Sequence, residues 1–163
     1  MEIEIVVILL IGAVLFAHSW QLLGRTDLKV PSIIALTVAI VAITLVAGMA
    51  ASGFPDVGVI MPILVVVYAA SLAGVGLWGF NPRALGFYSA FAAFGMLLLT
   101  LYSFVMGEAH TGIGSLILLV LFGLLAGHLI PTSQPIKTVT GWFFLVGSVI
   151  FAFGGAFIPL FSS

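Results

Sequence analysis

Long apolar stretches whose interiors carry no charged side chain restrict the fold of this chain more than any motif does. Six such runs cover residues 5–23, 31–51, 58–79, 83–106, 111–130 and 138–160. Each is long enough to cross the roughly 30 Å hydrocarbon core of a bilayer. Only 6% of the 163 residues are charged, against roughly 25% in soluble domains. We therefore expect an all-α integral membrane protein with six transmembrane helices, a single domain surrounded by lipid.

The short loops and the residue types present limit the chemistry. They leave no room for a kinase, a P-loop ATPase or a nucleic-acid-binding domain, and the absence of Cys excludes disulfides and thiolate metal sites. His18 and His128 lie near span ends, but only Asp27 is on that side as a third ligand, and zinc sites use three or more protein ligands. We expect neither an enzyme nor a bound cofactor or metal.

Charge placement predicts the orientation of the chain in the membrane. The N-terminal tail lacks the positive segment of a signal peptide, so we expect the first run to be retained as a spanning helix. Lys and Arg favour the cytoplasmic side of a membrane. All acidic residues except Asp27 fall in the N-terminal tail and in loops two and four, on the side opposite the basic residues, and Asp27 lies on the basic side. This pattern predicts both termini outside the cell membrane, which requires an even number of spans. The basic residues, all in loops one, three and five, are Arg25, Lys29, Arg83 and Lys137.

The three basic corners suggest how the spans are grouped. The segments LLGRTDLKVPS, LWGFNPRALG and HLIPTSQPIK each join an odd-numbered span to the next even-numbered one, which is a weak internal repeat. We therefore predict three helical hairpins, each made of two spans joined by a basic corner. Gly123 and Gly127 have the GxxxG spacing that lets helices approach closely, and we expect them to pack within or between subunits.

The span interiors contain no Asp, Glu, Lys or Arg. Charged side chains inside the membrane usually mark ion paths and proton relays, so a pump, a voltage sensor or a carboxylate-driven symporter is disfavoured. A passive route for a small neutral solute is favoured instead. Two alternatives stay open, a secondary transporter of a weak acid or metabolite and a non-transporting accessory protein of a membrane complex.

Polar residues within the spans are the candidate contacts for such a solute. His18 and Gln21 are three positions apart and therefore share one helix face. Because lipid is a costly neighbour for both, we expect them to point into the bundle. They then either hydrogen-bond a neighbouring helix or contact a permeating solute, and His128 has the same two interpretations.

Aromatic residues supply a second set of candidates. Phe87, Phe91 and Phe94 follow helical spacing, with Tyr88 beside them. Such a stripe is typical of helix packing or a lipid-facing surface, and the functional alternative is a narrow slot that sandwiches a planar neutral molecule. Tyr68 in the third span completes the predicted set of solute contacts.

Two stretches resemble a known family. VLFAHSWQLLGRTD (Val14–Asp27) and WGFNPRALGFYSAF (Trp78–Phe91) are similar to the first and third corners of the urea and short-chain amide channel family (AmiS/UreI). The resemblance implies a pore inside each protomer, a small neutral solute of the urea, formamide or acetamide class, and a homo-oligomeric, hexameric ring. The chain departs from the family pattern at His18-Ser19, where Asn-Gly is common, and at Ala35, where Asn is usual. Which solute of this class is carried therefore stays open.

Overall fold

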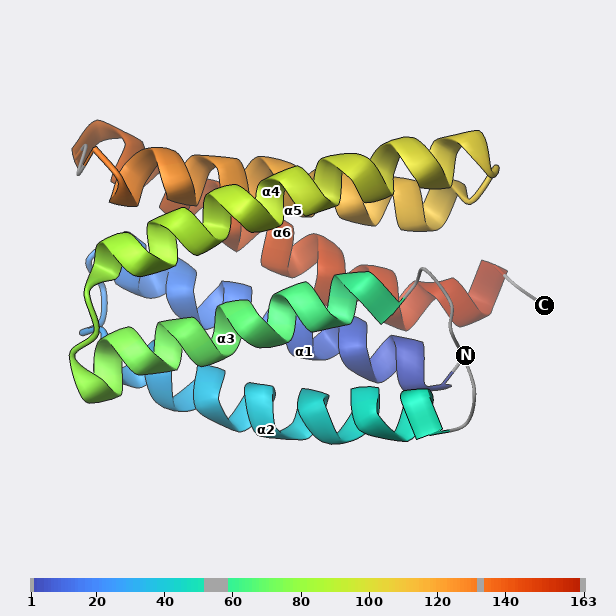
Figure 1. The fold of residues 1–163 in the computed structure, drawn as a ribbon, viewed down its shortest axis with the longest axis horizontal. Helices are drawn as coiled ribbons and strands as arrows, with labels where there is room; N and C mark the ends of the chain where they lie inside the picture. Colours follow the sequence, from blue (N-terminus) through green and yellow to red (C-terminus); the bar gives the residue numbers. More distant parts are fainter. Residues whose placement is uncertain (1, 52–58, 132–133, 162–163) are drawn as a thin grey trace.

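A computed structural model describes residues 2–51, 59–131 and 134–161 of the chain. Over these ranges the chain forms six α-helices side by side in a bundle (Figure 1). Among the described residues, five helices are long and apolar enough to cross a membrane, and the apolar part of the remaining one, Val6–Leu22, is slightly shorter. The expected all-α, six-helix membrane architecture is confirmed. The helices are α1 (Glu2–Leu22), α2 (Lys29–Ala51), α3 (Ile60–Trp78), α4 (Pro82–Val105), α5 (Ala109–Leu129) and α6 (Gln134–Phe161).

Short polar and glycine residues set the helix ends at the corners. The Asp27 carboxylate accepts hydrogen bonds from two backbone N–H groups at the start of α2, at 3.1 and 3.2 Å. Asn81 accepts one at the start of α4, at 2.9 Å, and Pro82 occupies a first-turn position where its missing N–H costs nothing. Helix α3 ends at Gly79, whose φ of 70° is left-handed and suits glycine.

The helices pack as antiparallel pairs, but the partners differ from those predicted. The most extensive contacts join α4 to α5, α1 to α6 and α2 to α3, whereas α1–α2, α5–α6 and especially α3–α4 contact each other less. The closest consecutive pairs are thus joined through loops two and four, not through the basic corners. The third pair brings the first and last helices together.

Small residues at the helix crossings allow close approach in two of these pairs, α2–α3 and α1–α6. A Cβ added to Gly76 of α3 would lie 1.9 Å from the Ser32 hydroxyl oxygen of α2, and one added to Gly12 of α1 would lie 3.2 Å from the Ser148 carbonyl of α6. Ser32 also donates a hydrogen bond to the Leu72 carbonyl of α3, at 3.1 Å. Close backbone approach and interhelical hydrogen bonds are the main sources of helix association inside a membrane, where the hydrophobic effect is weak.

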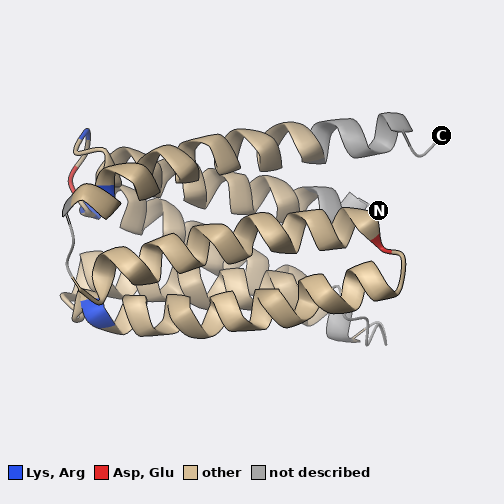
Figure 2. Cartoon of the chain, turned by 90° about the horizontal axis from the view of Figure 1, so that it is seen from above, with Lys and Arg blue, Asp and Glu red and all other residues tan. Residues whose placement is uncertain are grey.

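The described Lys and Arg residues all lie at the end of the bundle where α1 finishes (Figure 2). Glu108 lies between α4 and α5, at the other end. We call the first of these the basic end. The sequence-based sorting of basic residues to one end is therefore seen in the fold, and α1 begins and α6 finishes at the opposite end (Figure 1).

Candidate functional site

A cavity of about 380 Å³ opens at the basic end of the bundle, and we call it the vestibule. Its walls come from the last one or two turns of α1, α3 and α5, the first turns of α4 and α6, and Leu28 and Asn81 in the adjoining corners. It is lined by His18, Gln21, Leu22, Leu28, Leu72, Val75, Asn81, Pro82, Arg83, Leu85, His128, Leu129 and Lys137.

Three of the predicted site residues meet in this cavity. His18 and Gln21 from α1 and His128 from α5 all line the vestibule. His18 is buried, with only 3% of its surface exposed, while Gln21 and His128 are half-buried. The prediction that the His18/Gln21 face points into the bundle is confirmed.

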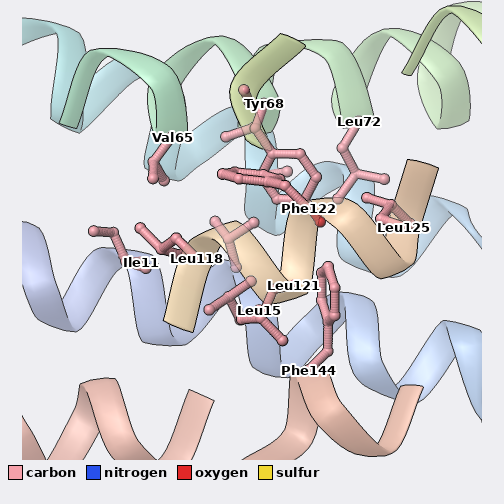
Figure 3. Packing of buried hydrophobic residues seen from close by; sticks show 14 of the residues in the cluster. Ile11, Leu15, Val65, Tyr68, Leu72, Leu118, Leu121, Phe122, Leu125 and Phe144 are labelled. Atoms are coloured by element: carbon pink, nitrogen blue, oxygen red, sulfur yellow. The ribbon is translucent and has the colours of Figure 1, made fainter. Parts of the chain in front are cut away.

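The predicted Tyr68 lies directly beyond the vestibule and is joined to His18. The His18 Nδ1 atom and the Tyr68 hydroxyl form a hydrogen bond between α1 and α3. Phe122 of α5 packs against the Tyr68 ring with centroids 5.3 Å apart, and Phe144 of α6 packs edge-on against the His18 ring at 5.4 Å. We call these four residues the central cluster (Figure 3 shows Tyr68, Phe122 and Phe144).

The central cluster places one neutral polar pair inside an apolar core. Tyr68, Phe122 and Phe144 are each at most 1% exposed. A buried polar group without a partner is costly, and here the imidazole and the hydroxyl satisfy each other. Both side chains can donate or accept hydrogen bonds, so the pair offers either role to a third molecule.

Apolar side chains fill the bundle on the far side of the cluster. Ile11, Leu15, Val65 and Leu118 pack there, each at most 5% exposed (Figure 3). On the near side Leu72 lines the vestibule. The site is therefore a cavity open at the basic end, with polar side chains set among aliphatic ones, whose inner wall includes His18, with Tyr68 and its aromatic neighbours behind it.

The predicted stripe on α4 lies elsewhere. Phe87 and Phe91 face away from the core, with 63% and 65% of their surfaces exposed, and Phe94 does the same. Tyr88 is half-buried, and its hydroxyl donates to the Leu64 carbonyl of α3, linking two helices. The stripe does not face the interior of the bundle, so Phe87 and Phe91 do not form an aromatic slot inside the protomer, whereas the interpretation as a lipid-facing surface agrees with their exposure. The reason is that the opposite face of α4 carries the small and aliphatic residues that pack against α5.

Sequence reasoning missed five residues of the site. Arg83 and Lys137 were used only to predict orientation, although their shared end already implied that they lie near His18 and His128. Asn81 was part of a corner with no assigned role. Phe122 and Phe144 have no polar neighbour in the sequence, and Phe144 is the last of three consecutive aromatic residues, so no sequence signal distinguishes them from other apolar residues.

Within the described residues, no three His, Cys, Asp or Glu side chains gather as metal ligands. Asp27, the acidic residue at the basic end, caps α2 and does not line the vestibule. Comparison of the chain with family models, curated proteins and solved structures finds no match. Function must therefore be inferred from the vestibule and the central cluster.

Proposed function

We propose that this protein is a passive membrane channel for small neutral amide-like solutes of the urea, formamide and acetamide class. The observation that carries the proposal is the His18–Tyr68 hydrogen bond at the inner end of the vestibule. An amide carries both a carbonyl acceptor and N–H donors, so it can replace each half of this bond as it passes. The flat rings of Phe122 and Phe144 beside the pair suit a planar solute.

The absence of charge within the spans supports a neutral solute. All charged side chains in the sequence lie at or near span ends. An ion would meet no counter-charge in the apolar packing beyond Tyr68, whereas a neutral molecule does not need one. Weak, exchangeable contacts also suit conduction, because a tightly held solute cannot leave.

Passage requires a movement of the central cluster. Because Tyr68 and Phe122 are fully buried and in ring contact, a solute leaving the vestibule must displace one of these rings. We propose that rotation of the Tyr68 side chain, with exchange of its hydrogen bond from His18 to the solute, opens the route.

Orientation and assembly complete the proposal. By the positive-inside rule, the basic end and the vestibule face the cytoplasm, and both termini lie outside the cell membrane. The exposed stripe of Phe87, Phe91 and Phe94 and the open face of Gly123, where an added Cβ would meet no atom within 4 Å, suit contact with other protomers. We propose a homo-oligomer, a hexameric ring by the resemblance to the channel family.

Stopped-flow light scattering on proteoliposomes tests the transport class. Urea and acetamide should enter faster than through protein-free lipid, without any ion gradient, and a protonophore should change the rate little. Accumulation that depends on a proton gradient would instead identify the secondary transporter, and permeability equal to that of lipid alone would favour the accessory protein.

The Tyr68→Phe variant tests the site. It keeps the ring and removes the hydrogen bond, so amide flux should fall while the oligomeric state stays the same. The matched control is Tyr88→Phe, whose hydroxyl bonds a backbone carbonyl between α4 and α3. Equal flux in wild type and Tyr68→Phe would remove Tyr68 from the route.

A further inference from the structure

The charge of the vestibule is not explained by a neutral solute. Arg83 and Lys137 line it, and no Asp or Glu side chain is among its lining residues. The acidic residue nearest in sequence to its wall, Asp27, is engaged with backbone N–H groups at the start of α2. The cavity thus carries positive charge without a carboxylate of its own.

The polar groups of the vestibule are donors of the kind that bind carboxylates. A guanidinium presents N–H groups in a planar fork that matches a carboxylate, and an ammonium adds a point charge. The side-chain amides of Gln21 and Asn81 supply further N–H donors on the same cavity. These groups come from the ends of α1, α4 and α6, so the bundle itself brings them together.

The remaining lining defines the rest of the ligand. Most of the other residues are aliphatic, among them Leu22, Leu72, Val75 and Leu129. A bare inorganic oxyanion gains nothing from such walls, whereas a short hydrocarbon chain is removed from water there. The volume of about 380 Å³ lies at the small end of the range of about 300–1,000 Å³ for ligand sites.

We propose that the vestibule is a binding site for a short-chain monocarboxylate, with the carboxylate held by Arg83 and Lys137 and the hydrocarbon chain against the aliphatic wall. This binding is independent of whether amides cross the membrane. If both proposals hold, a bound carboxylate lies over His18 and obstructs entry of a neutral solute from the basic end.

Thermal unfolding of the purified full-length chain in a neutral maltoside detergent tests the proposal without measuring transport. Sodium propionate or butyrate should raise the melting temperature saturably, as expected for a ligand that binds only the folded state. Sodium chloride and phosphate at equal ionic strength should raise it less, and propionamide, the neutral analogue, should not reproduce the effect.

Substitutions locate the site. Arg83→Gln and Lys137→Gln should each weaken propionate binding by about tenfold, roughly the loss of one charge-assisted hydrogen bond, and Arg83→Lys should restore part of it. Arg25→Gln and Lys29→Gln are the matched controls, because these residues lie at the same end but do not line the vestibule. Both controls should bind propionate like wild type.

Several results would overturn the proposal. One is equal stabilisation by every sodium salt, and another is propionate binding that survives both Arg83→Gln and Lys137→Gln. A third is stabilisation by a short-chain anionic phospholipid but not by propionate, which would assign the basic residues to lipid headgroups.

If a variant fails to fold, isothermal titration of propionate into wild type and Arg83→Lys still decides, because absence of measurable heat in wild type would refute the site. If amides cross the membrane but propionate does not change the melting temperature, the proposed channel is supported and the carboxylate site is refuted.

Discussion

The molecule contains two groups of aromatic residues that differ in almost every respect. Phe122 and Phe144 come from different helices, have no polar neighbour in the sequence and meet Tyr68 and His18 in the core. The stripe of Phe87, Phe91 and Phe94 belongs to a single helix, is conspicuous in sequence and points outward. In a bundle of apolar helices, helical spacing shows which residues share a face but not which face is buried, because lipid and core are equally apolar.

The largest expected contrast is in stability. Phe122→Ala should lower the free energy of unfolding by about 3–5 kcal/mol, as for large-to-small changes in well-packed cores. Phe91→Ala should change it by less than about 0.5 kcal/mol, as for exposed positions. Thermal melts in detergent, at dilutions where light scattering reports a monomer, measure both. Similar losses in the two variants would contradict the assignment of these groups to inside and outside.

The second contrast compares a glycine at a helix crossing, Gly76, with a glycine on an open helix face, Gly123. Gly76→Ala places a methyl group where Ser32 already lies, and overpacking of this kind typically costs about 1–3 kcal/mol. Gly123→Ala meets open space and should be neutral or slightly stabilising, since Ala favours a helix over Gly by roughly 1 kcal/mol. The measurement is the melting temperature of each variant in detergent. A destabilised Gly123→Ala monomer would show that this face is packed within the chain.

The third contrast, similar in size to the second, concerns the buried His18–Tyr68 pair. Tyr68→Phe leaves the buried His18 imidazole without its partner, which should cost about 1–3 kcal/mol. The double variant with His18→Leu should cost less than the sum of the single changes, since interacting pairs are not additive. Additive losses in this double-mutant cycle would show that the two groups do not interact.

The smallest effect concerns selectivity. Because Phe91 lies on the outer surface, Phe91→Ala should leave the ratio of acetamide to urea permeability unchanged within error. Replacing Phe144 with Leu beside His18 should change it. If the ratio of acetamide to urea permeability changed in Phe91→Ala but not in the Phe144 variant, the α4 stripe would have to line the solute route.

The sequence alone predicts the helices, the separation of the basic end from the opposite end, and part of the candidate site. Uncharged runs specify spans, and the basic corners specify which end holds Arg83 and Lys137. His18 and Gln21 were predictable because a polar face has only one favourable direction in lipid. The pairing of the helices could not be predicted from the sequence, because it depends on close steric fits such as that of Gly76 with Ser32. The contacts of Tyr68 with His18 and Phe122 were not predictable either, because they depend on which helices are neighbours.

The contact between α1 and α6 has a consequence for biosynthesis. Ribosomes deliver the chain from its N-terminus, so α2–α3 and α4–α5 can pair soon after each second helix emerges, whereas α1 waits for the last helix before Gly12 meets Ser148. Phe144 and Lys137 also arrive on α6, so the central cluster and the vestibule wall are completed together at the end of synthesis. A nascent protein interrupted before α6 therefore lacks the site, and the face of α1 that α6 covers in the complete fold stays unpaired.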